Sequence, residues 1–354
     1  MKHLLAAALL VLGVTSASHA AGRPLRIYFI DVEGGQSTLI VTGAGETLLV
    51  DTGYPDRDGR DPDRIMAAMR DANVSRIDYL LITHMHEDHN GGAAELARHV
   101  PIGAFIDYGA PVETGDDVVR AFAAYSGERD KAGKNGPPHI IPKPGDRIPL
   151  LGVDLRVVSA DGETIDKPLE GAGETNSACS AYEPRNFATR ENPRSVGLLL
   201  RYGRFRFLDL GDLVGPPLLK LVCPDNLIGP IDAYLITHHA NADSNVSPIY
   251  AAIHPRVAIS NNGAYKGGSP PTWASLHQRD DIEGVWALHK SLIDGADNFP
   301  DTFIANLDFG ERDHAAWLKL TASDEGSFSM TNGRTGWTRT YEVRSEKLEL
   351  RSTK

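Results

Sequence analysis

The sequence predicts an α/β protein in which two related halves face each other as a four-layer αβ/βα sandwich, with extra strands at the C-terminus. Apolar runs of strand length alternate with segments whose apolar residues recur at helical spacing. An internal repeat supports the two halves, because residues 77–84 (IDYLLITH) closely match residues 231–238 (IDAYLITH). Two such halves facing each other would place the ends of both repeated strands at one cleft.

The size and composition are those of a globular protein. The 354 residues suffice for one large domain or two modest ones, and 41% hydrophobic with 23% charged residues is ordinary for a soluble protein. We expect one domain over residues 21–300, with residues 301–354 packed on it as a β extension. The sequence leaves the oligomeric state open.

The chain is expected to begin with a targeting signal over residues 1–20. A short polar start precedes an apolar run over residues 4–14, which is too short to span a bilayer comfortably. Ser18-His19-Ala20 then offers small residues for cleavage after Ala20. We expect a soluble mature protein, periplasmic or secreted and free of the membrane, although an uncleaved anchor is the alternative.

Charge and cysteine content restrict the partners and the compartment. The formal net charge of −11 disfavours long nucleic acid, whose binding depends largely on phosphate contacts. A small anionic substrate remains compatible, because metal ions bring their own positive charge. Cys179 and Cys223 are either a disulfide, which export would permit, or two free thiols.

The elements follow in order from apolar patterning and turn signals. In the first half we expect strands at residues 25–30, 37–41, 46–50, 77–83 and 104–107, and helices at 62–73, 92–99 and 117–125. In the second half we expect strands over 140–151 and 153–159 around turns at Pro144-Gly145-Asp146 and Gly152, and further strands at 195–201, 204–208, 231–237, 257–260 and 285–288. We expect helices at 213–222, 248–254 and 271–281. The polar loop 161–193 is long enough to suggest a border of the active site.

The main candidate site follows the strand at residues 77–83. His84, His86, Asp88 and His89 form the pattern H-x-H-x-D-H. Residues two apart in an extended segment point to the same side, so His84 and His86 can face one metal ion. Imidazoles with a carboxylate suit zinc or a similar divalent ion. A solvated loop that happens to carry histidines is the alternative.

Several motifs resemble, in order, those of the metallo-β-lactamase-fold hydrolases. They are the H-x-H-x-D-H pattern, Asp51-Thr52-Gly53 after the third strand, Gly211-Asp212 after a hairpin, and His238-His239-Ala240 after the repeated strand. The resemblance covers roughly residues 25 to 260. The resemblance implies the metallo-β-lactamase fold. It also implies a metal centre of one or two Zn²⁺ ions, with Mn²⁺ as the alternative metal.

The resemblance also implies individual roles. His84 and His86 would hold one ion together with a third histidine, while Asp88, His89 and a later histidine would hold the second. Asp212 would bridge the two ions, with Asp209 less suited, and Asp51 would orient the metal loop from behind. The repeat equates His238 with His84, whereas the family's His-Ala or His-Gly-Ser ending favours His239, which we prefer.

The third histidine of the family pattern is not evident. His139 is the only histidine between His99 and Asp212, and its setting is that of a strand edge. The segment Asn192-Pro193-Arg194-Ser195 resembles instead the hydrolase domain of competence (DNA-uptake) proteins, where Asn and Ser precede this strand. Asn176 or Asn192 could then stand in for the missing ligand.

We therefore expect an exported metallo-hydrolase that attacks a small-molecule substrate with a zinc-bound hydroxide. Asp88 would be both a ligand and a possible proton acceptor. A small phosphodiester or related phosphoester is the preferred substrate, and a β-lactam or lactone is the alternative. A non-catalytic exported metal-binding protein is the rival from another class.

Overall fold

The computed structural model describes residues 23–55, 57–131, 133–182, 190–244, 246–310 and 314–343. The predicted targeting signal at residues 1–20 lies outside these ranges. Among the described residues, no helix combines the length and apolar character that crossing a membrane requires.

Two large sheets form the centre of the molecule. The first has the order β18-β17-β16-β1-β2-β3-β4-β5-β6, and the second β15-β14-β13-β12-β11-β10-β8-β7, with β9 paired to β8. The strands of the first sheet are β1 (Leu25–Phe29), β2 (Thr38–Val41), β3 (Thr47–Val50), β4 (Ile77–Leu81), β5 (Ile102–Ile106), β6 (His139–Ile140), β16 (Leu318–Ala322), β17 (Phe328–Asn332) and β18 (Thr338–Tyr341). Those of the second are β7 (Arg147–Ile148), β8 (Asp154–Ala160), β9 (Glu163–Thr164), β10 (Gly197–Tyr202), β11 (Phe205–Asp209), β12 (Ala233–Leu235), β13 (Val257–Ser260), β14 (Gly284–His289) and β15 (Ile304–Asn306).

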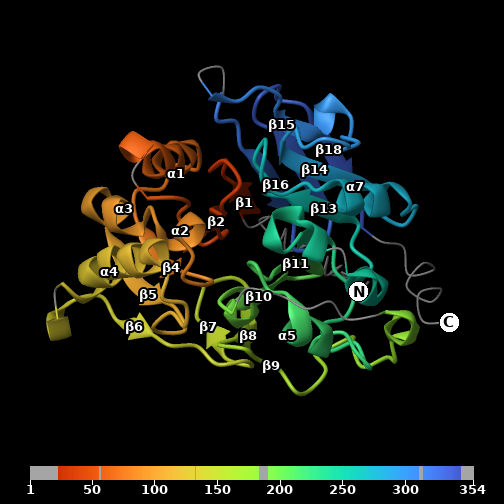
Figure 1. Ribbon diagram of the computed structural model, residues 1–354, viewed down its shortest axis with the longest axis horizontal. Helices are drawn as coiled ribbons and strands as arrows, with labels where there is room; N and C mark the ends of the chain where they lie inside the picture. Colours follow the sequence, from red (N-terminus) through yellow and green to blue (C-terminus); the bar gives the residue numbers. More distant parts are fainter. Residues whose placement is uncertain are drawn as a thin grey trace, which may run out of the picture.

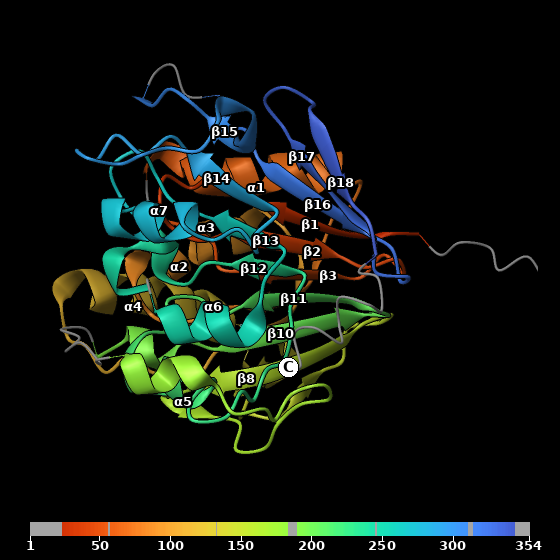
Figure 2. The same ribbon diagram turned by 90° about the vertical axis from the view of Figure 1, so that its right-hand side faces the viewer.

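Helices lie on the outer face of each sheet, as Figure 1 shows for α1, α3 and α4 on one side and α5 and α7 on the other. The helices are α1 (Arg60–Asp71), α2 (Glu87–Asn90), α3 (Ala93–His99), α4 (Asp116–Asp130), α5 (Gly215–Lys220), α6 (Ser247–Ile253) and α7 (Pro270–His277). The turned view in Figure 2 shows the strands stacked between these helix layers. This confirms the predicted sandwich with extra C-terminal strands.

Apolar side chains fill the spaces between the layers. Phe29 of β1 meets Phe207 of β11 at a ring-centroid distance of 5.8 Å, so the two sheets pack face to face. On the outside of the second sheet, Leu218, Ile249 and Trp273 bring one buried residue each from α5, α6 and α7 into a separate core. Burial of this apolar area is the main stabilising term of the fold.

The internal repeat corresponds to equivalent strands of the two sheets. β4 runs parallel to β3, which forms an antiparallel pair with β2. In the same way, β12 runs parallel to β11, which forms an antiparallel pair with β10. β4 therefore ends next to the residues that follow β3, and β12 ends next to the residues that follow β11.

The strands predicted around Pro144-Gly145-Asp146 belong to two different sheets. Ile140 belongs to β6 at the edge of the first sheet, whereas Arg147 and Ile148 form β7 at the edge of the second. Pro142 and Pro144 lie between them. Proline has no N–H for a sheet ladder, so the chain leaves one sheet here and joins the other.

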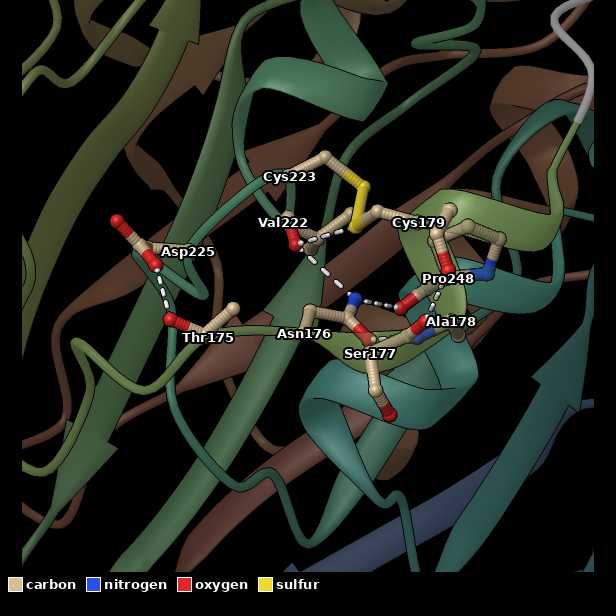
Figure 3. The surroundings of a disulfide bond; sticks show 10 residues. Thr175, Asn176, Ser177, Ala178, Cys179, Val222, Cys223, Asp225 and Pro248 are labelled. Carbon is tan, nitrogen blue, oxygen red and sulfur yellow. Dashed lines mark hydrogen bonds between the residues drawn. A yellow bond between two sulfur atoms is a disulfide. The ribbon is translucent and has the colours of Figure 1, made fainter.

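Cys179 and Cys223 are joined by a disulfide with an S–S distance of 2.04 Å, which decides between the two possibilities left open by the sequence. Figure 3 shows Asn176 beside it, with its amide nitrogen donating to the carbonyl oxygens of Val222 and Pro248. The oxygen of the same amide accepts from the backbone N–H of Ala178. Asn176 is thus engaged with the main chain around the disulfide and does not reach the metal motif.

Candidate metal centre

The candidate site forms where the carboxyl ends of β3, β4, β11 and β12 meet. Asp51 follows β3, the metal motif begins after β4, Asp212 follows β11 and His239 follows β12. Gly211 permits the close approach of the two halves, because a Cβ at this residue would lie 2.8 Å from that of Thr83. Parallel strands that end at one edge thus bring residues from both halves into one cluster.

Four buried side chains could hold one ion. The Nε2 atom of His89 lies 3.4 Å from Oδ2 of Asp88, and Nε2 of His239 lies 3.2 Å from the same oxygen. Both nitrogens are 3.3 Å from Oδ2 of Asp212. These ligand atoms all lie within 4.8 Å of one another, and the set of two imidazoles and two carboxylates suits a divalent cation such as zinc.

The hydrogen bonding of this cluster also fits a cation. Within the described residues, Nε2 of His89, Nε2 of His239 and Oδ1 of Asp212 are buried without a hydrogen-bond partner. Buried polar atoms normally have partners, and an ion is one explanation for those that do not. A metal among these atoms would satisfy them and balance the carboxylates.

The two carboxylates of the cluster are already ionised, as metal ligands must be. Burial acts to raise the pKa of Asp88, but Lys266 and His89 hold that pKa well below its ordinary value. Burial likewise opposes ionisation of Asp212, yet the surrounding histidines lower its pKa strongly. Both side chains are therefore carboxylates at neutral pH.

A second group of imidazoles lies next to this cluster. Nε2 of His84 is 3.0 Å from Nδ1 of His86 and 3.8 Å from Oδ2 of Asp212. Burial and the neighbouring His89 hold the pKa of His84 well below the ordinary imidazole value, so this ring is neutral and can donate a lone pair. Asp212 thus lies between the two groups, where one carboxylate oxygen could serve two ions.

Carboxylates behind the histidines fix their rings. Asp51 lies 2.7 Å from Nδ1 of His89 and accepts from both the backbone N–H and the hydroxyl of Thr83 at 2.7 Å. On the other side, Oε2 of Glu113 is 3.2 Å from Nε2 of His86. A partner on one ring nitrogen directs the other toward a metal.

His238 and His239 lie in a short turn whose residues have φ of 51° and 54°. This left-handed backbone is uncommon for residues other than glycine and is often found at functional sites. His239 joins Asp88 and His89 as described, whereas His238 contacts Asp243 through Nδ1 at 2.8 Å and lies 3.7 Å from Oδ2 of Asp212 through Nε2. Both histidines therefore face the centre, but on different sides.

The remaining candidates from the sequence are Asp209, His139 and Asn192, and none of them belongs to the four-residue cluster. Asp209 lies behind the centre, where Gln36 donates to both of its oxygens at 3.1 Å, and burial raises its pKa to about 7. His139 lies on the edge strand β6, 2.9 Å from Asp107. Asn192 is buried in a 3₁₀ turn, and its amide nitrogen is 3.2 Å from Nε2 of His238. This contact brings the end of the predicted active-site loop to the centre.

Lys266 and Tyr54 also lie at the centre, although no sequence motif predicts them. The ammonium group of Lys266 pairs with Asp88 and donates to the hydroxyl of Tyr54 at 3.0 Å. A single lysine in a Gly-rich loop carries no motif that would predict this role. Its side chain is 36% exposed, which leaves it in reach of a ligand.

Comparison with known families gives a match over part of the chain. Residues 30–177 match the profile of the Metallo-beta-lactamase superfamily. The match includes the whole H-x-H-x-D-H motif, while Asp212, His238 and His239 lie beyond it. The match supports membership of the metallo-β-lactamase superfamily. Members of this superfamily are hydrolases. A search of curated proteins gives no match to the chain.

Several solved structures resemble the chain at low sequence identity. Zn(2+)-bound PqqB from Methylobacterium extorquens aligns at 14% identity with a TM-score of 0.44, over 76% of this chain and 98% of that one. CmlA, a diiron beta-hydroxylase from Streptomyces venezuelae, aligns at 16% with a TM-score of 0.37, over 67% of this chain and 44% of that one. A metallo beta lactamase from Hirschia baltica aligns at 13% with a TM-score of 0.27, over 51% and 60% of the two chains. The chain thus spans less than two thirds of the hydroxylase and of the lactamase.

Proposed function

We propose that this protein is an exported metal-dependent hydrolase of the superfamily that cleaves a small phosphodiester or related phosphoester. The observation that carries the proposal is the cluster of Asp88, His89, Asp212 and His239, in which the buried Nε2 atoms of both histidines lack hydrogen-bond partners within the described residues. When bound, a metal ion such as Zn²⁺ or Mn²⁺ supplies Lewis-acid charge and lowers the pKa of a coordinated water.

The protein residues supply the rest of the chemistry. Asp88 and Asp212 hold their carboxylates at the centre, and Asp51 and Glu113 hold His89 and His86 in position. Asp88 has an oxygen that can accept the proton of the attacking water, within reach of the Lys266 ammonium. Lys266 also places a positive charge beside the centre, where it favours an anionic group on the substrate.

The substrate class rests on two features. Asn192 and Ser195 occupy the place of the third-histidine motif, in the pattern that resembles the hydrolase domain of competence proteins, and this supports a phosphodiester. The acidic chain, with its net charge of −11, disfavours a long polyanion. A small phosphodiester satisfies both features, since metal ions can neutralise one phosphate without a basic groove.

The deciding experiment compares bis-nitrophenyl phosphate, nitrocefin and an acyl lactone, each with zinc and with manganese. We expect turnover of the phosphodiester, and its loss in Asp212→Ala but not in the exposed control Asp297→Asn. Turnover of nitrocefin or the lactone that Asp212→Ala abolishes, with the phosphodiester inert, would replace the substrate proposal. Metal uptake without turnover of any substrate would favour a non-catalytic metal-binding protein.

Export is part of the proposal. The apolar run at residues 4–14 before Ser18-His19-Ala20 supports it, and a disulfide is typical of oxidising compartments. We expect cell fractionation of the native host to place the protein in the periplasm or medium, with a mature N-terminus at Ala21. An intact Met1 on protein recovered from the cytoplasm would contradict this part.

A further inference from the structure

We propose that a cavity on the outer face of the second sheet binds a small divalent oxyanion of the phosphate type. The cavity has a volume of about 220 Å³, and four arginines line it: Arg147, Arg156, Arg201 and Arg206. It is separate from the metal centre, so the proposal depends neither on metal binding nor on the substrate.

The strands β7, β8, β10 and β11 bring the arginines to this face. Leu199 of β10 packs in the core on the outside of the second sheet, and Arg156 of β8 lies directly opposite it in the register. Residues opposite each other share a face of the sheet, so Arg156 also points outward. Arg206 lies near the beginning of β11, whereas Asp212 follows the end of that strand. The cavity and the metal centre are therefore at different ends of β11.

The strand register places the arginines in opposed pairs. Arg147 lies directly opposite Arg156 between β7 and β8, and Arg201 lies directly opposite Arg206 between β10 and β11. Like charges directly opposite each other in an antiparallel pair are destabilising. An anion among the four guanidinium groups would offset this repulsion.

The carboxylates in the cavity do not balance the positive charge. Asp154 lies 3.0 Å from Nε of Arg147 and 3.4 Å from Nε of Arg156, and Glu170 pairs with Arg201 at 2.6 Å. The lining thus carries four guanidinium groups and two carboxylates, which leaves an excess of two positive charges. A divalent anion would neutralise that excess.

This excess is unlike the rest of the chain. The formal net charge is −11, so carboxylates are abundant. Arg129, for example, has two of them, with Asp107 at 3.0 Å and Asp130 at 2.8 Å. A cavity in which arginines outnumber carboxylates therefore goes against the composition of the protein, as expected where an anion is bound.

The guanidinium groups keep donors for such an anion. Among the described residues, Arg147 and Arg156 contact Asp154 through Nε alone, which leaves both Nη atoms of each group for a ligand. Arg206 is held in place, because its Nη2 donates to the carbonyl oxygen of Glu170 at 3.1 Å. The planar array of N–H groups on arginine matches the oxygens of a phosphate, which it can bind in a bidentate manner.

Apolar residues line the cavity beside these charges. Leu199 is buried, and Pro168 and Leu169 come from the long polar loop over residues 161–193. The N–H of Leu169 donates to the carbonyl oxygen of Leu227 at 2.9 Å, which fixes this part of the loop. Apolar surroundings lower the local dielectric constant and strengthen attraction between charges. This part of the loop therefore forms a wall of the anion cavity.

The test titrates inorganic phosphate into zinc-loaded protein by calorimetry, at low ionic strength and at a pH at which phosphate is mostly divalent. We expect binding that persists in Asp212→Ala, which removes a residue of the metal cluster. In that background Arg156→Gln and Arg201→Gln should each weaken binding by about tenfold or more. Arg98→Gln is the matched control, because Arg98 is also exposed and paired with a carboxylate, and it should leave the affinity unchanged.

Competing anions test the class of ligand. Sulfate should displace phosphate, because it has the same shape and charge, whereas chloride at equal ionic strength should not. Glycerol phosphate separates two sources of the same chemistry, since tighter binding than that of inorganic phosphate would identify a phosphate carried by a larger molecule. Displacement by chloride as effective as by sulfate would overturn the proposal, because it would show general screening only.

Thermal unfolding in the Asp212→Ala background gives a second measurement. A ligand that binds the folded state raises the unfolding temperature by mass action. Phosphate should therefore stabilise Asp212→Ala and Arg98→Gln/Asp212→Ala, but have little effect on Arg156→Gln/Asp212→Ala. An equal effect on all three, or phosphate binding that Asp212→Ala abolishes, would overturn the proposal. A wild type that takes up no metal would instead overturn the proposed function and leave the anion cavity unaffected.

Discussion

Asp51 and Nδ1 of His89 lie 2.7 Å apart, and both side chains are fully buried between the two halves of the molecule. Asp51 is held there with φ of 61° and accepts two further hydrogen bonds from Thr83. The carboxylate thereby fixes the hydrogen of His89 on Nδ1 and directs Nε2 toward Asp88 and Asp212. Asp51, directly after β3, thus controls a ligand in α2.

Asp51→Asn should weaken zinc binding about 10- to 100-fold, as expected for loss of a carboxylate behind a histidine ligand. An amide that donates to Nδ1 would move the ring hydrogen to Nε2, where it blocks the metal. Zinc titration against a competing chelator measures the change. Asp297→Asn, far more exposed, is the control. Equal affinity in Asp51→Asn and wild type would show that the hydrogen bond does not orient the ligand.

Lys266→Met should strengthen metal binding and weaken binding of an anionic substrate. The ammonium pairs with Asp88, so it competes with a metal ion for that carboxylate. A hydrogen bond to a charged group is worth about 1.5–3 kcal/mol, which corresponds to about tenfold or more in either affinity. Chelator competition gives the first effect and KM for bis-nitrophenyl phosphate the second. Lys319→Met, on the strand β16, is the control. A lower metal affinity in Lys266→Met would contradict the competition.

Metal-free protein should lose stability as the pH rises above the ordinary imidazole range. Burial opposes the charge on His89, but Asp212, Asp88 and Asp51 outweigh it and raise the pKa of His89 well above its ordinary value. The stabilising contribution is complete below the unfolded pKa of about 6.5 and is lost as the pH rises through the raised folded pKa.

Thermal unfolding of chelated protein across this range measures the effect. Zinc-loaded protein should not show the same loss, because the ion replaces the proton among the carboxylates. If the unfolding temperature of the chelated protein rose with pH, and rose more than that of the zinc-loaded protein, the raised pKa of His89 would be contradicted.

Replacing both cysteines by serine should reduce stability but not metal content. The disulfide joins residues 44 apart in the chain, and a closed loop of this length is expected to contribute about 4 kcal/mol through the unfolded state. Urea unfolding with and without a reductant checks the value. Elemental analysis should give unchanged zinc, because Asn176 and the disulfide lie away from the centre. Loss of zinc in the folded double variant would show that the disulfide also supports the site.

The fold was largely predictable because its signals are local. Apolar runs of strand length, turn residues and helical spacing depend on near neighbours, and the repeat at residues 77–84 and 231–238 identified equivalent strands of two sheets. For the segment 140–151 the sequence predicted strands around Pro144-Gly145-Asp146, but not that they join different sheets. β6 pairs in the first sheet and β7 in the second, and these pairings depend on strands distant in the sequence.

The sequence by itself determined the ligand types and their attachment to strand ends, since H-x-H-x-D-H, Gly211-Asp212 and His238-His239 each follow an apolar strand. The tertiary structure alone decided which residues face them. Glu113 reaches His86 from the loop after β5, Lys266 reaches Asp88 across 178 positions, and Asn192 meets His238 across 46. Such contacts depend on how the two sheets and their loops pack. A single charged or amide residue forms no periodic pattern in the sequence, so its partner cannot be predicted from the sequence.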